Sequence, residues 1–249
     1  MVPTASDGTL TTPLFLGKTK ELHRYVSTLS VDQLSRVMHI SKTLAAETHE
    51  AIKSWSTESS SAAVNTFRGD IYSGLRALEF TQAEQAFAAK HLVILSGLYG
   101  MLRPYDKICP YRLEAAYKLP DAPYTNLYKY WGDALAGALP KDGPIINVTS
   151  VEYEKLILPF VDATRIITPR FLTRGKDGVP TFVVVHAKIA RGAFARWIIK
   201  RGVDTTKGIE AFDDLGYVYD TQLSTDTQPV FVCDEFKGIG LSQRLISGL

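Results

Sequence analysis

The sequence predicts an α/β protein in which a central mixed sheet is covered by helices and follows a helical N-terminal section. Short, continuous apolar runs in the middle of the chain are typical of strands buried on both faces, which favours a sheet covered by helices. Stretches with apolar residues at helical spacing precede and separate these runs. Because no clean linker is visible, we expect one domain over residues 1–249, with a helical section at 18–55 and a sheet-containing body at 67–233.

The N-terminal section is expected to be helical over 18–27, 31–40 and 44–55. Ser30 occupies the N-cap position of the second helix, and a tight turn at 39–43 is predicted to join it to the third. Residues 54–66 are rich in Ser and Thr and are expected to form a surface loop.

In the body, apolar runs alternate with helical patterns. Pro169 is expected to mark an edge or a bend within its strand. The predicted strands cover 91–96, 144–149, 164–172 and 181–186, and the predicted helices cover 81–90, 126–139, 152–157 and 188–201.

Composition excludes several classes of protein. The 249 residues are 45% hydrophobic and 22% charged, as in ordinary globular proteins, and the net charge of +2 is too small to indicate a nucleic-acid binder by itself. No apolar run approaches the roughly 20 residues of a membrane helix, and the first residues do not resemble a signal peptide, so we expect a cytoplasmic protein with no membrane partner. Two distant cysteines and five scattered histidines predict no metal site, and no cofactor is expected.

Charge is unevenly distributed near the C-terminus. Residues 204–249 carry eight acids against three Lys or Arg. Residues 181–203 carry no acid and five cations, namely Lys188, Arg191, Arg196, Lys200 and Arg201.

Wound as a helix, the basic stretch separates into two faces. Lys188, Arg196 and Lys200 lie opposite the apolar face, with Arg191 at the border. Near the start of such a helix, backbone N–H groups favour an anion. The alternative is a solvated helix whose cations pair with the acidic C-terminal part. The apolar face comprises Ala190, Phe194, Trp197 and Ile198.

Two glycine-bearing stretches combine charged and aromatic side chains. Residues 67–75 (FRGDIYSGL) place Arg68, Asp70 and Tyr72 around two glycines. Residues 95–114 leave a predicted strand through a glycine-bearing loop, and glycines allow backbone N–H groups to approach an anion closely. Together with the basic helix, these stretches predict an anion-binding cleft.

Five blocks carry a family resemblance: FRGDIYSGL (67–75), ILSGLYGMLRPYDKICPYRLE (94–114), LYKYWGD (127–133), INVTSVEYEK (146–155) and AKIARGAFARWII (187–199). In order and spacing the chain resembles the YaaA-type peroxide-stress protein family from about residue 34 to 219. The resemblance implies an α/β fold with a basic cleft, a helix-hairpin-helix element at 31–55, and a cytoplasmic DNA-binding protein of the oxidative-stress response. Residues 2–6 are the nearest match to the Ser-Pro-Ala-Lys-type motif of this family and lack its lysine.

The first functional hypothesis is DNA binding in the basic cleft, directed mostly at the backbone and largely independent of sequence. Its partner would be duplex DNA or a distorted or single-stranded site. Tyr99 and Trp131 are candidates for base stacking or, alternatively, for core packing, and Tyr72 and Tyr111 are further candidates for stacking. The candidate phosphate contacts are Lys188, Arg191 and Arg196, helped by Arg68, Arg103, Arg112 and Lys155.

The second hypothesis is an enzyme, a diverged biosynthetic paralogue, that acts on a small anionic or nucleotide-like substrate in the same cleft. Carboxylates beside Lys and Arg shift pKa values into a range useful for catalysis. The alternative is that Asp70, Asp106 and Glu114 only orient neighbouring cations. The candidate acids or bases are Asp70, Asp106, Glu114 and Glu152, and the candidate nucleophiles or proton donors are Tyr72, Ser96 and Lys155.

Overall fold

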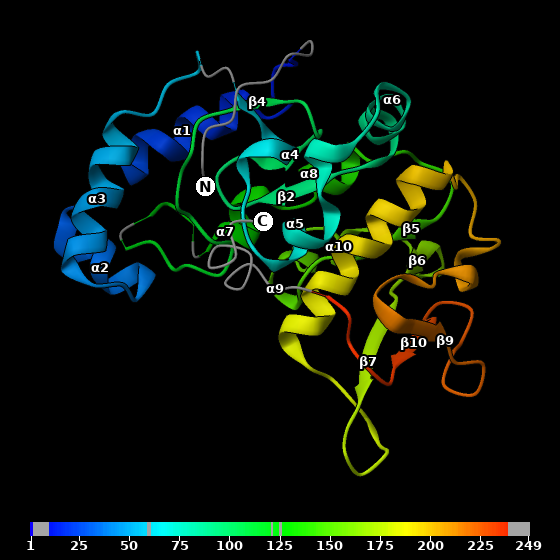
Figure 1. The fold of residues 1–249 in the computed structure, drawn as a ribbon. Coiled ribbons are helices and arrows are strands. Elements are labelled where there is room, and N and C mark those ends of the chain that lie inside the picture. Colours follow the sequence, from blue (N-terminus) through cyan, green and yellow to red (C-terminus); the bar gives the residue numbers. More distant parts are fainter. Residues whose placement is uncertain (2–9, 59–60, 121, 125, 239–249) are drawn as a thin grey trace. The chain divides into compact units, whose positions relative to one another are not determined.

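The computed structural model describes residues 1, 10–58, 61–120, 122–124 and 126–238 (Figure 1). The partial N-terminal motif at 2–6 lies outside these residues. The chain divides into two compact units, and the single domain expected over 1–249 stays a prediction. Unit 1 comprises Met1–Phe67, Leu92–Leu139 and Ser150–Phe160, and unit 2 comprises Arg68–His91, Pro140–Thr149 and Val161–Leu249.

The three N-terminal helices predicted from the sequence are confirmed in unit 1. Ser30 caps the second of them, because its Oγ accepts from the Gln33 amide at 3.3 Å while Gln33 Oε1 accepts from the Ser30 amide at 2.9 Å. The unit contains α1 (Leu16–Val26), α2 (Val31–Met38), α3 (Lys42–Lys53), α4 (Ala63–Thr66), α7 (Leu127–Trp131), α8 (Ala134–Gly137) and α9 (Val151–Glu154).

The connection between α2 and α3 is only three residues long. His39 ends α2 with a left-handed φ of 52°, and Ser41 caps α3 by accepting from the Leu44 amide at 3.2 Å. The two helices pack against each other. A helical pair with a tight turn is therefore present, and its identity as a helix-hairpin-helix stays a prediction.

The strands of unit 1 form two small antiparallel pairs. The pair β2 (Ile94–Ser96) with β3 (Gly100–Leu102) lies within the longest of the family-like blocks, and β1 (Ser61–Ala62) pairs with β4 (Lys107–Ile108). The predicted loop at 54–66 is wrong at its end, where β1 and α4 begin. The predicted helix at 126–139 is broken at Gly132, whose φ of 53° is incompatible with a helix interior, and the helix predicted at 152–157 ends early, at Glu154.

Unit 2 combines helices with a mixed sheet. Its helices are α5 (Asp70–Leu75), α6 (Gln82–His91) and α10 (Val184–Arg201). The sheet has the order β8-β7-β10-β9, with β10 parallel to β7 and antiparallel to β9. Its strands are β7 (Arg170–Arg174), β8 (Pro180–Thr181), β9 (Tyr217–Tyr219) and β10 (Val230–Cys233), and β5 (Ile145–Ile146) pairs in parallel with β6 (Ile166–Ile167).

The mixture of helices and strands agrees with the predicted α/β class, but the described strands form four separate small sheets in place of one central sheet. The predicted strand at 164–172 is interrupted at Pro169, which separates β6 from β7 and so marks the expected bend. The runs at 91–96 and 144–149 contribute only short strands. Short 3₁₀ turns occupy Ala77–Glu79, Leu158–Phe160, Ala163–Arg165, Ile209–Ala211 and Asp214–Gly216.

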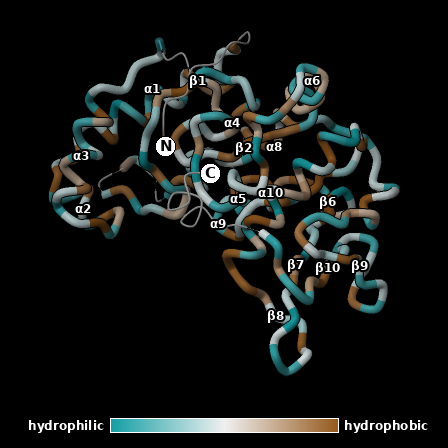
Figure 2. Tube along the Cα trace, viewed as in Figure 1, coloured by the Kyte–Doolittle hydropathy of each residue, from teal (hydrophilic) through white to brown (hydrophobic). Residues whose placement is uncertain are grey.

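The strand predicted at 181–186 is wrong. Only Thr181 belongs to a strand, and α10 already begins at Val184. Figure 2 shows this hydrophobic stretch between β8 and α10, and the side chains that suggested a buried strand are exposed: Phe182 by 54%, Val184 by 54% and Val185 by 46%. The helix predicted at 188–201 is confirmed, with an earlier start.

The core of unit 2 is aromatic. Phe171 on β7 lies 5.7 Å from Phe194 on α10 and 5.5 Å from Phe231 on β10, measured between ring centroids. Ala190 and Trp197 are also buried, while Ile198 is only partly so, which confirms the predicted apolar face of α10. Among the described residues, no helix combines the length and the apolar character needed to cross a bilayer.

Candidate functional site

In unit 1 the block at 94–114 folds back on itself. A Cβ at Gly97 would overlap the carbonyl oxygen of Leu113 and lie 3.1 Å from the carbonyl carbon of Glu114. The absence of a side chain therefore lets the end of β2 lie directly against the backbone that carries Glu114.

Ser96 and Tyr111 are hydrogen-bonded inside this fold. The Ser96 Oγ lies 2.6 Å from the Tyr111 Oη and accepts from the Tyr99 amide at 2.8 Å. Ser96 is fully buried, so its hydroxyl, a predicted nucleophile, anchors the turn after β2 and orients Tyr111.

Two carboxylates join this segment to α9. Glu114 accepts a short hydrogen bond from the Tyr153 hydroxyl, and Glu152 Oε1 accepts from the Ala116 amide at 2.9 Å. Burial raises the pKa of the Tyr153 phenol, and the neighbouring Tyr111 and Glu114 raise it further, so this hydroxyl stays a proton donor at neutral pH. Ser96, Tyr111, Tyr153 and Glu114, with Glu152 beside them, define a polar cluster in unit 1.

The polar cluster also contacts a third block, at 127–133. Tyr128 on α7 donates its hydroxyl to the backbone carbonyl of Glu152 at 3.1 Å. Burial raises the pKa of the Tyr128 phenol and, secondarily, Glu152 raises it as well. The blocks at 94–114 and 127–133 and the second half of the block at 146–155 therefore meet in unit 1.

Tyr153 was missed by the sequence reasoning. It stands between two residues that were selected, Glu152 and Lys155, within the block at 146–155. A tyrosine flanked by functional groups in a family-like block was the signal that could have identified it.

The exposed cations of unit 1 differ in their surroundings. Arg112 is exposed and interacts with Tyr117, whose phenol pKa is raised chiefly by burial and then by Glu114, while Arg112 opposes the rise. Lys155 follows α9, is exposed, and forms no ion pair within the part of the chain that the structure describes.

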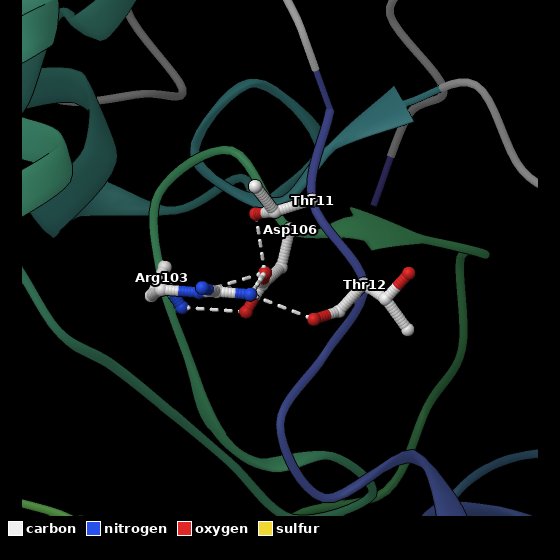
Figure 3. Close-up of polar contacts among 4 residues, drawn as sticks. All are labelled: Thr11, Thr12, Arg103 and Asp106. Atoms are coloured by element: carbon white, nitrogen blue, oxygen red, sulfur yellow. Dashed lines mark hydrogen bonds and ion pairs between the residues drawn. The ribbon is translucent and has the colours of Figure 1, made fainter.

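Arg103 and Asp106 are engaged with each other (Figure 3). The buried Asp106 carboxylate accepts from the Thr11 hydroxyl at 2.6 Å, from the Arg103 amide at 2.8 Å and from the Arg103 guanidinium at 2.9 Å. Arg103 also donates to the Thr12 carbonyl at 2.7 Å. This pair fastens residues 11–12 to the loop at 103–106, which matches the alternative in which the acid orients a cation.

The prediction that Tyr99 and Trp131 stack on bases is wrong, because both rings are buried, each with 1% exposure. Trp131 donates its indole N–H to the Gly97 carbonyl at 3.1 Å, and the Tyr99 hydroxyl accepts from Trp55 Nε1 at 2.8 Å and from the Cys109 amide at 3.0 Å. Both side chains therefore belong to the interior of unit 1, as the alternative of core packing predicted.

In unit 2 the two remaining blocks pair as α5 and α10. A Cβ at Gly74 would overlap the Ile189 carbonyl oxygen, and one at Gly192 would overlap the Ile71 carbonyl oxygen, so the two helices cross in backbone contact. Both glycines serve helix packing, which for Gly74 corrects the expectation that it opens the backbone to an anion.

The crossing places the predicted residues of 67–75 and 187–199 on two directly packed helices. Arg68 is exposed, Asp70 opens α5, and Tyr72 follows two residues later. Asp70 and Tyr72 are both partly buried. On α10, Lys188 is exposed and Arg191 is partly buried.

Two of the other α10 cations are held by acids of the segment at 77–91. Arg196 pairs with Glu79 at 3.0 Å and Lys200 with Glu84 at 3.5 Å, while the Arg201 guanidinium lies 4.7 Å from the Trp197 ring centroid. The acids that pair with Arg196 and Lys200 come from residues 77–91 and not from the acidic C-terminal part, which corrects that alternative for these two cations. Lys188 forms no ion pair within the described ranges.

The structure therefore brings Ser96 and Glu114 into one cluster in unit 1, while Asp70 and Tyr72 lie on α5 in unit 2. Within the described residues, no group of three or more His, Cys, Asp or Glu is arranged to hold a metal ion.

Comparison with known proteins identifies relatives over nearly the whole chain. The family model described as peroxide stress protein YaaA matches residues 2–223, so the similarity begins well before residue 34. A UPF0246 protein of Salinispora tropica is 51% identical over 239 residues, covering 95% of this chain and 91% of the relative. UPF0246 proteins of Ralstonia pickettii and Ruegeria sp. are 38% and 37% identical, each covering about nine tenths of both chains.

Proposed function

This chain belongs to the peroxide stress protein YaaA family, and we propose that it is a stress-protection protein that binds DNA largely independently of base sequence. The observation that carries the proposal is the uneven pairing of the cations on α10. Arg196 and Lys200 are paired with acids, whereas Lys188 is exposed and has no ion-pair partner among the described residues.

The geometry favours contact with a phosphate backbone. Lys188 belongs to a helix fixed against α5 by Gly74 and Gly192, and Arg68 precedes α5 with its side chain exposed. Cations on rigid elements attract phosphates without reading base edges, so the binding is largely insensitive to sequence.

Salt dependence tests the proposal. Fluorescence anisotropy with a labelled duplex and a labelled single strand measures affinity as salt rises. If Arg68, Lys188 and Arg191 each neutralise one phosphate of the duplex, log K falls against log salt with a slope of about −2.7, or about 40-fold between 50 and 200 mM salt.

The variant Lys188→Ala with Arg191→Ala should flatten this slope by about 1.8 and weaken binding to every sequence alike. Lys90→Ala with Lys207→Ala removes the same charge from exposed positions of unit 2 and should leave the slope unchanged. Absent or salt-insensitive binding by the wild-type chain contradicts the proposal.

A second candidate function rests on the polar cluster. Two hydrogen-bonded pairs, Ser96–Tyr111 and Tyr153–Glu114, each hold a hydroxyl within proton-transfer range of its partner, as an enzyme acting on a small anionic substrate requires. Tyr153→Phe should then abolish turnover of such a substrate while DNA affinity stays unchanged. Unchanged turnover in this variant would show that the polar cluster does not carry out catalysis.

A further inference from the structure

A groove on unit 1 combines positive charge with an aromatic wall. It has a volume of about 510 Å³, and its lining residues belong to α1 and to the segment that follows α3, two elements whose places in the fold Figure 1 shows. The groove is widely open to solvent, so a ligand bound there would keep part of its own surface exposed. Its lining residues are Lys20, His23, Arg24, Ser27, Trp55, Ser56 and Thr57.

The two cations of the groove are unpaired. Lys20 and Arg24 are four residues apart on α1, so they share one face of the helix, and both are exposed. Neither side chain has an ion-pair or hydrogen-bond partner within the described part of the chain. Like charges at this spacing repel each other, and a bound anion would relieve that repulsion.

The aromatic wall is held in place from behind. His23 Nε2 lies 2.8 Å from the Ile52 carbonyl, which can only accept, so this nitrogen carries the proton. The His23 ring stacks on Trp55 with centroids 4.3 Å apart, and Trp55 donates its indole N–H to the Tyr99 hydroxyl at 2.8 Å. The wall is therefore rigid before any ligand arrives.

The hydroxyl groups of the groove supply one further donor. Ser56 Oγ accepts from the Glu58 amide at 3.1 Å, which leaves its hydroxyl hydrogen available. Ser27 donates to the Arg24 carbonyl at 2.7 Å, and Thr57 donates to Glu58 Oε1 at 3.3 Å. The Glu58 carboxylate thus neighbours Thr57 at one end of the groove.

We propose that this groove binds the phosphate group of a nucleotide or of a nucleic-acid strand. Lys20 and Arg24 supply two positive charges, which match the two negative charges of a terminal phosphate, and the Ser56 hydroxyl donates to its oxygens. The inference goes beyond the proposed function: it places an anion site in unit 1, on residues separate from α10, for a ligand that need not be a polymer.

Trp55 provides the readout. The chain has three tryptophans, and Trp131 and Trp197 are buried at 1% and 5% exposure, whereas Trp55 lines the groove. Tryptophan emission is measured while the full chain is titrated, at low salt, with adenosine monophosphate and with a 5′-phosphorylated oligothymidylate. Trp55→Phe identifies the part of the signal that comes from the groove, and calorimetry with the same ligands measures affinity independently of fluorescence.

Lys20→Gln with Arg24→Gln should weaken binding by about tenfold or more, which corresponds to the loss of two charge-assisted contacts. Lys90→Gln with Lys207→Gln removes the same charge from exposed positions in unit 2 and should change the affinity by less than about twofold.

Binding of either ligand that depends on Lys20 and Arg24 supports the proposal. Binding of the mononucleotide identifies a free nucleotide as the source of the phosphate, and binding of the oligonucleotide alone identifies a strand. The proposal is overturned if neither ligand binds the wild-type chain, or if the Lys20 and Arg24 variant binds as tightly as the control. Both results are independent of Lys188 and Arg191, so they do not decide the duplex experiment.

Discussion

Replacing Gly192 with Ala should force α5 and α10 apart and destabilise unit 2. A Cβ at this position would overlap the Ile71 carbonyl oxygen and lie 2.7 Å from the Leu75 amide nitrogen, whereas ordinary contacts begin near 3.4 Å. Both neighbours are backbone atoms of α5, so no side-chain rotation can relieve the overlap. The helices themselves must move.

The magnitude follows from two opposing effects. Overpacking a tight interface costs about 1–3 kcal/mol, and the upper end applies because Gly74, on the facing helix, is packed against Ile189 equally closely. Ala is favoured over Gly inside a helix by about 1 kcal/mol, which offsets part of this cost. The free energy of unfolding should therefore fall by about 2 kcal/mol, which lowers the Tm of a chain of this size by about 4–8 °C.

Thermal unfolding followed by circular dichroism tests this result. Gly17→Ala and Gly137→Ala are matched controls, because both positions are helical and have no atom within 4 Å of the added Cβ. Each control should raise stability by about 0.4–1 kcal/mol. A Gly192→Ala protein that melts at or above the wild-type temperature would refute the backbone-contact crossing.

Three further outcomes are expected. Asp106→Ala should lower the free energy of unfolding, measured with urea, by about 2–3 kcal/mol, because it removes a buried carboxylate that holds Thr11 and Arg103. The control Asp142→Ala, at an exposed position, should leave the stability unchanged. Equal losses of stability in the two variants would contradict this role of Asp106. Burial raises the pKa of Tyr105, Tyr124 and Tyr217 to about 12, so the folded chain keeps protons that the unfolded chain releases above about pH 10. Stability is thus complete below about pH 10 and falls as pH rises toward 12, and urea midpoints that do not change over this range would exclude the effect. Ser30→Ala should lower the free energy of unfolding by about 1 kcal/mol, because it removes the N-cap of α2. Ser30→Asp should retain most of this stability, since Asp is also a good N-cap residue. An unchanged Tm for Ser30→Ala would show that the capping box does not stabilise the protein.

The start of α10 shows what local sequence could not predict. Residues 182–185 are aromatic and β-branched, which favours a strand, and a continuous apolar run suggests burial. The helix extends back to Val184 because Ala187, Ala190 and Phe194 recur at helical spacing and are buried against the sheet of unit 2. Tertiary packing overrides propensity here, whereas Ser30 was predictable because a cap needs only its own next three residues.

The candidate sites show the same division. Grouping residues by block predicted that Ser96 and Glu114 belong together. In the structure Ser96 is hydrogen-bonded to Tyr111 and Glu114 to Tyr153, and Tyr111 raises the pKa of the Tyr153 phenol. The roles of Arg103 and Asp106 depend on Thr11 and Thr12, about 90 residues away in the chain, which no local pattern specifies. Lys20 and Arg24 lie outside every block, and only the proximity of Trp55 gives them a context.

The glycines of the family-like blocks have structural roles. Gly74, Gly97, Gly100 and Gly192 each lie where a Cβ would collide with neighbouring backbone or with the Trp131 ring. Gly69 and Gly132 have φ values of 134° and 53°, which side chains rarely adopt. Packing and backbone conformation therefore account for all six glycines without a ligand.

If the glycines of these blocks build the scaffold, a function must reside in polar side chains that the scaffold leaves unused. Four of the candidate residues form ion pairs that hold segments together, namely Arg103, Asp106, Arg196 and Lys200. Lys188 on α10 and Lys155 after α9 are exposed and unpaired among the described residues, so folding alone does not explain them. Variants at these two lysines should change ligand binding more than Tm, and variants at the four paired residues should do the opposite.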